Sequence, residues 1–314
     1  MAGNSFLKPE VIANTAIGLL ERELVLGSLV WTDHGINFAG AKGDAVTIRV
    51  PARTTARELE WRGDRAGSDF TGIQLDTLTE ASQVVTLNHH LYSAVPVTDE
   101  ELTLDVDDFG QRVLEPQVRA VATEIDNRIA AMISGADYET ELTADPADPW
   151  KAVVDARTQL NRNNVGREGR VLLCGPDFEA AMLKSDRLSL VDHSGDPSAL
   201  REATVGRMAG FTVIASNAIP ADEAYAFVPS AFLVATRAPI VPAGAAFGAA
   251  ASFAGYAMRW LRDYDASLAQ DRSVVSCFAG LNIMLDQENP GDGSSPSTLK
   301  RAVKLVLGEA ENPS

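Results

Sequence analysis

The sequence is poor in the residues that form disulfides and metal sites. It has two cysteines, Cys174 and Cys277, and four histidines among 314 residues. Each cysteine lies in an apolar run, without a second cysteine or a histidine at the spacing of a metal site. A chain of this length can bury a large core without cross-links. We therefore expect two buried free thiols and no metal centre or cofactor.

Positive charge is also scarce. The sequence has 27 basic and 43 acidic residues, which gives a formal net charge of −16. Proteins that read nucleic acid through its phosphates usually carry the opposite sign, because those contacts need lysine and arginine. The acidic excess is therefore evidence against such a reader, and its simplest interpretation is solubility.

No stretch has the composition of a membrane span. Residues 238–258 are uncharged over 21 positions, which is the length of a spanning helix. Nine of them are alanine, three glycine and two proline, and none is leucine, so their hydrophobicity is too low for stable insertion. The N-terminal residues also lack the pattern of a secretory signal. We expect a soluble protein with no membrane partner.

Nucleotide-binding and hydrolase motifs are incomplete or absent. Residues 35–42 resemble a phosphate-binding loop, but an extra alanine precedes Lys42 and Gly43 replaces the Ser or Thr that would hold magnesium. The chain has neither a G-x-S-x-G elbow nor a G-x-G-x-x-G loop. These absences leave no nucleotide-binding or serine-hydrolase function that the sequence supports.

The histidines offer little chemistry. His89 and His90 are adjacent in an expected strand, so their side chains point to opposite faces and cannot chelate one metal together. A nucleophilic Cys174 paired with His193 is conceivable, although an inert core cysteine is the more common case. A soluble enzyme that uses Cys174 is kept as a minor alternative.

Two segments alternate in the manner of half-buried strands, residues 45–51 and residues 83–97. A polar, glycine-bearing segment separates them, which predicts a long hairpin arm that buries little of itself. Five clustered arginines belong to this arm: Arg49, Arg53, Arg57, Arg62 and Arg65. We take them as candidate subunit contacts that meet an acidic neighbouring surface. The alternative is a solvated hairpin whose arginines face water.

Residues 107–134 have the clearest helical pattern, with apolar residues at i, i+3, i+4 and i+7. Asp107 or Asp108 is the expected cap, and Pro116 predicts a kink or a break. A further helix is predicted over residues 9–27, where Pro9 suits the first helical position.

The remaining sequence mixes short elements of both kinds. We expect helices at 150–161 and 176–184, and strands at 170–174, 211–216, 224–228, 231–235, 256–264 and 272–286. Residues 287–298 have the composition of a flexible linker. Residues 299–307 place apolar side chains on one helical face, so a short helix is predicted there.

Several stretches, taken in order, carry a resemblance to a known family. They are KGDAVTIRVP at 42–51, VTLNHHLYSAVPVTDEELTLDVDDFGQRVLEPQV at 85–118, VLLCGPDFEAAML at 171–183, ALREATVGRMAGFTVIASNAIP at 199–220 and RWLRDYDASLAQDRSVVSCFAGLNIMLD at 259–286. Together they resemble the major capsid (coat) proteins of tailed bacteriophages, which have the Hong Kong 97-type fold. The order and spacing of the stretches carry the resemblance, because no single piece is as specific as a catalytic motif.

The resemblance implies an α+β fold with an extended β-hairpin loop, a peripheral domain with a long spine helix, and an α/β axial domain. The implied parts are an N-terminal arm at 1–38, the extended loop at 39–97, the peripheral domain with its spine helix at 98–134, the axial domain at 135–250, return strands of the peripheral domain at 251–286, and a linker with a C-terminal tail at 287–314.

The same resemblance implies a structural protein and not an enzyme. It would assemble itself through hexamers and pentamers into an icosahedral head that encloses double-stranded DNA without reading its sequence. It would be assembled in the host cytoplasm, with a scaffolding protein as partner, and would reside in the virion. Lys42 is the one lysine of the extended loop, which argues against covalent isopeptide cross-links. An encapsulin-type bacterial shell that holds cargo enzymes is the main alternative.

Overall fold

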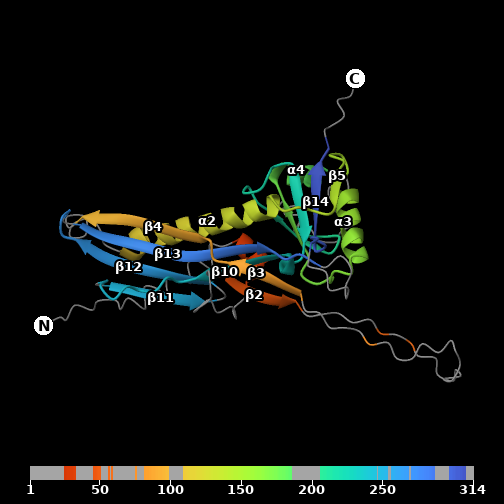
Figure 1. The fold of residues 1–314 in the computed structure, drawn as a ribbon. Helices are drawn as coiled ribbons and strands as arrows, with labels where there is room; N and C mark the ends of the chain where they lie inside the picture. Colours follow the sequence, from red (N-terminus) through yellow and green to blue (C-terminus); the bar gives the residue numbers. More distant parts are fainter. Residues whose placement is uncertain are drawn as a thin grey trace.

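The computed structural model describes residues 25–32, 45–50, 56, 58, 75, 81–98, 109–185, 206–245, 247–253, 256–268, 270–286 and 297–308. The helix predicted over 9–27 lies outside these residues except at its end. The described elements form two lobes, each with a six-stranded sheet, and a separate two-stranded hairpin (Figure 1). We call them the long lobe, the compact lobe and the hairpin.

The long lobe is built around β13 (Gln270–Ile283), which is hydrogen-bonded along both edges. β4 (His89–Thr98) pairs with one edge, and β12 (Tyr256–Asp265) and β10 (Phe232–Arg237) follow each other along the other edge. β11 (Phe247–Phe253) extends the sheet beyond β12, and the short β1 (Trp31–Thr32) lies parallel to β10.

Within the alanine-rich segment 238–258, residues 247–253 form β11 and residues 256–258 begin β12. Within the described part of the chain, no helix is long and apolar enough to cross a membrane.

Helix α2 (Glu115–Ser134) lies along the long lobe (Figure 1). Pro116 occupies its first turn, directly after a π-helical turn at Gly110–Leu114. Proline lacks an N–H and its ring clashes with the carbonyl four residues earlier, and a wider turn accommodates both problems. The predicted irregularity is thus a π turn. The predicted caps Asp107 and Asp108 lie outside the described residues.

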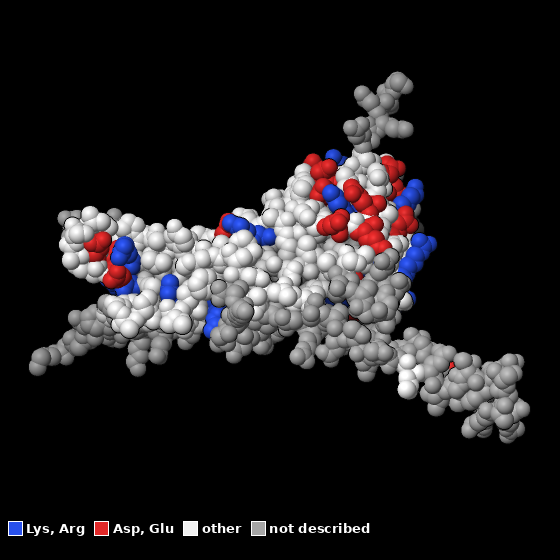
Figure 2. Space-filling model, viewed as in Figure 1, with Lys and Arg blue, Asp and Glu red and all other residues white. Residues whose placement is uncertain are grey.

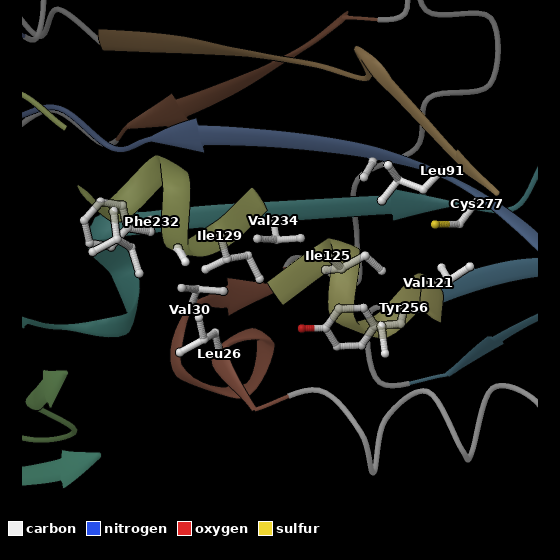
Figure 3. Packing of buried hydrophobic residues seen from close by; sticks show 14 of the residues in the cluster. Leu26, Val30, Leu91, Val121, Ile125, Ile129, Phe232, Val234, Tyr256 and Cys277 are labelled. Carbon is white, nitrogen blue, oxygen red and sulfur yellow. The ribbon is translucent and has the colours of Figure 1, made fainter. Parts of the chain in front are cut away.

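The apolar face of α2 packs on the sheet of the long lobe. Val121, Ile125 and Ile129 are at most 2% exposed. Figure 3 shows them among side chains from β4, β10 and β13, with residues from the N-terminal segment beside them. This continuous core places the helix against strands that come from distant parts of the sequence.

A buried polar group also fixes α2 on this sheet. The Gln117 side chain donates to the carbonyl oxygens of Ser93 (3.1 Å) and Ser273 (2.8 Å), and it accepts from the Ser273 hydroxyl (2.7 Å). The indole N–H of Trp260 donates to the same hydroxyl oxygen (3.0 Å). One side chain of α2 is thereby tied to β4 and β13, and through the serine to β12.

The compact lobe contains one mixed sheet in the order β5-β14-β9-β6-β8-β7. Its strands are β5 (Glu141–Ala144), β6 (Val171–Cys174), β7 (Arg207–Met208), β8 (Phe211–Ala215), β9 (Glu223–Phe227) and β14 (Ala302–Leu307). Helices α3 (Trp150–Arg162) and α4 (Pro176–Lys184) contribute Leu160 and Phe178 to the core of this lobe. The elements predicted at 150–161, 170–174, 176–184, 211–216 and 224–228 are confirmed within two residues.

The prediction of a helix over residues 299–307 is wrong. β14 is a strand inside the sheet, parallel to β5 and antiparallel to β9. Val303 and Leu305 are fully buried, while Lys304 on the other face pairs with Glu223 at 2.8 Å. Periodicity cannot distinguish helix from strand in so short an apolar run, and here the two neighbouring strands decide the conformation. The segment is part of a core and not a tail.

Strand pairing also changes the expected boundaries. β10 lies within the range 135–250 expected for the axial domain and β11 begins within it, yet both belong to the sheet of the long lobe. The single strand expected at 83–97 is two strands, β3 (Ala81–Thr86) and β4. Only β3 pairs with β2 (Ala45–Val50), so the described hairpin consists of β2 and β3.

We predict that Leu305→Ala lowers the free energy of unfolding by about 2–5 kcal/mol, because it leaves a cavity in a closed core. Leu307→Ala removes the same atoms from a partly exposed position of the same strand and should cost less. Urea unfolding followed by circular dichroism measures both. Equal, small losses would contradict the placement of β14 in the core.

We predict that Gln117→Ala destabilises the chain by about 1–3 kcal/mol or more, the cost of one buried polar group left without its partner. Asn127→Ala, at an exposed position of the same helix, should stay within about 0.5 kcal/mol of the unsubstituted chain. Circular dichroism during urea unfolding reports the stability of both variants. A neutral Gln117→Ala would show that apolar packing alone holds α2.

Candidate functional site

The candidate contact surface is the hairpin, and the structure anchors its base on the long lobe. The Asn282 side chain donates to the carbonyl oxygen of Val84 at 2.8 Å, and the Gln83 side chain donates to that of Leu285. Val85 is fully buried in a small core that the hairpin shares with β10. The base of the hairpin is therefore held by two polar contacts and one apolar contact.

The backbone of the hairpin also approaches β13 closely at Gly280. A Cβ atom at this position would lie 2.5 Å from the carbonyl oxygen of Thr86, which is closer than van der Waals contact allows. Only glycine permits this approach. These contacts fix the position of β2 and β3 against β10 and β13 of the long lobe (Figure 1).

Of the five candidate arginines, Arg49 lies on β2, in register with Ser82 of β3. The other four, Arg53, Arg57, Arg62 and Arg65, lie outside the described residues. The structure thus describes the base from which the arginine-bearing segment extends. The contacts of these arginines stay a prediction.

A carboxylate of α2 holds the N-terminal segment. Asp126 accepts hydrogen bonds from the backbone N–H of Val25 (2.9 Å) and of Gly27 (3.1 Å), at the beginning of the 3₁₀ turn η1 (Leu26–Leu29). It serves as a cap for this turn although it is distant in the sequence. Burial raises the pKa of Asp126, and the backbone hydrogen bonds oppose that shift. The sequence pattern gave no sign of this contact.

The two thiols are buried, as the sequence predicts. Cys174 and Cys277 are free cysteines with no exposed surface. Burial raises the pKa of Cys277 to about 12. Burial, followed by the negative charge of Glu179, raises the pKa of Cys174 further. Neither sulfur forms a thiolate at neutral pH, so neither is an activated nucleophile.

The histidines that the structure describes do not meet. The Nδ1 atom of His89 lies 3.4 Å from the guanidinium of Arg128 on α2, whereas the His90 ring packs on Phe278 with 4.6 Å between ring centres. The partner considered for Cys174, His193, lies outside the described residues. Among the residues that are described, no three side chains are grouped to bind a metal.

The compact lobe has two oppositely charged ends that sequence analysis missed. The acidic end consists of Asp145, Asp177 and Asp222, which adjoin the carboxyl ends of β5 and β6 and the start of β9. The basic end consists of Arg162, Arg167 and Arg207, near the amino ends of β6 and β8. Figure 2 shows acidic groups gathered over part of the compact lobe.

This segregation of charge depends on strand direction and register, which the sequence pattern did not establish. β5, β6 and β14 all run antiparallel to β9 or parallel to one another, so their carboxyl ends meet at one edge of the lobe. Residues that are far apart in the sequence, such as Asp145 and Asp222, come to the same edge for this reason alone.

Comparison with known proteins identifies the family. A family model for phage capsid proteins matches residues 83–275, which is more than half of the chain. No curated protein matches the sequence. The chain therefore belongs to the phage capsid protein family.

Solved structures share the fold at low sequence identity. A chain of Mycobacterium phage Che8 is 19% identical with a TM-score of 0.61, over 97% of this chain and 94% of that one. The capsid of cyanophage P-SCSP1u is 14% identical with a TM-score of 0.63, over 98% and 91%. The head of Helicobacter pylori bacteriophage KHP40 is 14% identical with a TM-score of 0.57, over 98% and 94%.

These matches establish the α+β, Hong Kong 97-type fold that the sequence resemblance implied. With the family assignment, they identify the chain as a major capsid protein, whose function is to form the shell of a phage head. The role of such a protein is structural.

We predict that neither thiol reacts with iodoacetamide in the native protein at pH 7.5, because each thiolate would have to form in an apolar interior. Both thiols should react after unfolding in urea. Mass spectrometry of the labelled chain measures the extent and the site of reaction. Rapid labelling of Cys174 in the native state would instead support the enzyme alternative.

Proposed function

We propose that this capsid protein assembles through hexamers and pentamers into an icosahedral head that encloses double-stranded DNA. The observation that supports this most directly is the hairpin of β2 and β3, a two-stranded ribbon that is anchored on the long lobe and whose strands are joined by residues 51–80. Such an arm gains little from its own subunit, because a two-stranded ribbon is marginally stable alone. It becomes stable when it lies on a neighbour.

The parts of the subunit receive roles within this proposal. The long lobe with α2 is the peripheral domain and its spine helix, and the compact lobe is the axial domain. The hairpin, with the segment it carries, is part of the extended loop, and residues 1–38 are the N-terminal arm. The hydrogen bonds of Asp126 to η1 hold one part of that arm on α2.

The remaining partners follow from the same proposal. A scaffolding protein guides assembly in the host cytoplasm, and the finished subunit resides in the virion. The DNA is enclosed without sequence-specific contacts, in keeping with the net charge of −16. The protein has no catalytic activity of its own, which agrees with the burial of both thiols.

The proposal predicts that four arginines of the extended loop are needed for shells. Replacing Arg53, Arg57, Arg62 and Arg65 by glutamine should give a folded subunit that forms no shells, because the loop loses its attraction to the acidic surface of a neighbour. Replacing the same four by lysine keeps the charge and should keep the shells. Negative-stain electron microscopy of the purified proteins, with circular dichroism for folding, makes the comparison. Normal shells from the glutamine variant would refute the role of the loop.

A further inference from the structure

The basic end of the compact lobe is a group of arginines that form no ion pair with any described residue. Arg162, Arg167 and Arg207 are exposed, and none has a carboxylate within ion-pair distance in the part of the chain that the structure describes. Arg157, also exposed, lies beside Gly210 in the turn between β7 and β8. Glu168 is the exposed carboxylate within this group.

Arg170 shows how closely these charges are grouped. It is 3% exposed and satisfies its guanidinium with the carbonyl oxygens of Gly166 (2.8 Å) and Val165 (2.8 Å). Burial lowers its pKa, and the charges of Arg157 and Arg167 lower it further. The fold therefore holds several positive charges close together, and within the described residues none of them is in ion-pair contact with a carboxylate.

At the acidic end, backbone hydrogen bonds hold the ends of the strands together. The N–H of Asp177 donates to the carbonyl oxygen of Ala221 (2.9 Å), and that of Leu307 donates to the carbonyl oxygen of Asp222 (2.9 Å). The N–H of Gly308 donates to the carbonyl oxygen of Ala144 (2.8 Å), beside Asp145. The three carboxylates Asp145, Asp177 and Asp222 are exposed.

These acidic side chains also lack cationic partners of their own. Among the described residues, no lysine or arginine lies within ion-pair distance of Asp145, Asp177 or Asp222. The nearby Lys304 is already paired with Glu223. Among the described residues, each end of the lobe therefore carries exposed charges of one sign that form no ion pair, although the charge of Asp222 also acts on Lys304.

The two ends cannot neutralise each other within one subunit, because they lie at opposite ends of the same sheet. A second copy of the chain, however, carries an acidic end that can meet the basic end of the first. A contact between two different surfaces of identical subunits is heterologous, and such contacts close into a ring when the rotation between neighbours allows it. Complementary charge also fixes the register of such a contact and speeds its formation.

We propose that the basic end of one compact lobe docks on the acidic end of the next copy's compact lobe, and that this contact, repeated, closes the capsomer ring. The inference rests on the proposed function, since it names the surface by which copies meet. We favour a second copy over nucleic acid as the partner of the basic end. Every subunit carries one basic end and one acidic end, so each basic end in a ring has an acidic partner.

The test reverses the charge at each end separately and then at both. One variant carries Arg167→Glu and Arg207→Glu, a second carries Asp177→Arg and Asp222→Arg, and a third combines all four changes. Asp155→Arg, an exposed position of α3 outside both ends, is the control for net charge. Sedimentation velocity at low salt measures association, and circular dichroism with urea unfolding confirms that each variant is folded.

We expect the unsubstituted protein and the control to associate. In either two-residue variant, the fraction of protein that sediments as monomer should be at least tenfold larger. The four-residue variant regains complementary ends and should associate again. A one-to-one mixture of the two defective variants should also associate. Added salt should weaken every one of these complexes, because exposed charges are screened.

Other outcomes overturn the inference. Association that is unaffected by reversal at either end, with normal shells by electron microscopy, refutes the docking contact and leaves the proposed function standing. Failure of the four-residue variant and of the mixture refutes the pairing of the two ends. If only the basic-end variant is defective and it also loses binding to a duplex DNA fragment, the partner is nucleic acid. An unsubstituted protein that stays monomeric at low salt refutes the docking contact, and it leaves the proposed function standing because that function includes a scaffolding protein.

Discussion

The long lobe depends on the hydrogen-bonding of β13 along both of its edges. β4 occupies one edge, and β12 and β10 share the other. The same strand bears Ser273, which holds Gln117 of α2, and Asn282, which holds the base of the hairpin. The helix, the sheet and the arm are thus positioned by one element. A change that displaces β13 would alter the direction of the arm as well as the packing of the core.

Local patterns predicted much of the fold and little of its pairing. The alternation in β2 and the amphipathic spacing in α3 are properties of the segments themselves, so sequence reasoning found them. The conformation of β14 and the place of β10 in the long lobe depend on strands that are distant in the sequence, and no local period encodes those partners. The resemblance supplied the fold class, but not the strand order that brings Asp145 and Asp222 together.

The fold shows where some of the residues that make up the net charge lie. The excess of acidic residues suggested solubility and argued against a reader of nucleic acid. In the compact lobe, however, Asp145, Asp177 and Asp222 lie at one end of the sheet, and Arg162, Arg167 and Arg207 lie at the other. A capsid subunit must stay soluble as a monomer and still recognise copies of itself. Separated charges of both signs meet these two requirements, since an overall negative charge repels while matched ends attract.

The position of β14 has a consequence for how the subunit reaches its native state. Its neighbours β5 and β9 precede all of β10 to β13 in the chain, whereas β14 follows them. The compact lobe therefore stays open, with two unpaired strand edges, until the strands of the long lobe have been synthesised. The high contact order of this closure predicts slow folding. It also means that the compact lobe is not one continuous stretch of the chain, so an isolated version would need a short turn from Val228, at the end of β9, to Arg301, at the start of β14, which are hydrogen-bonded neighbours.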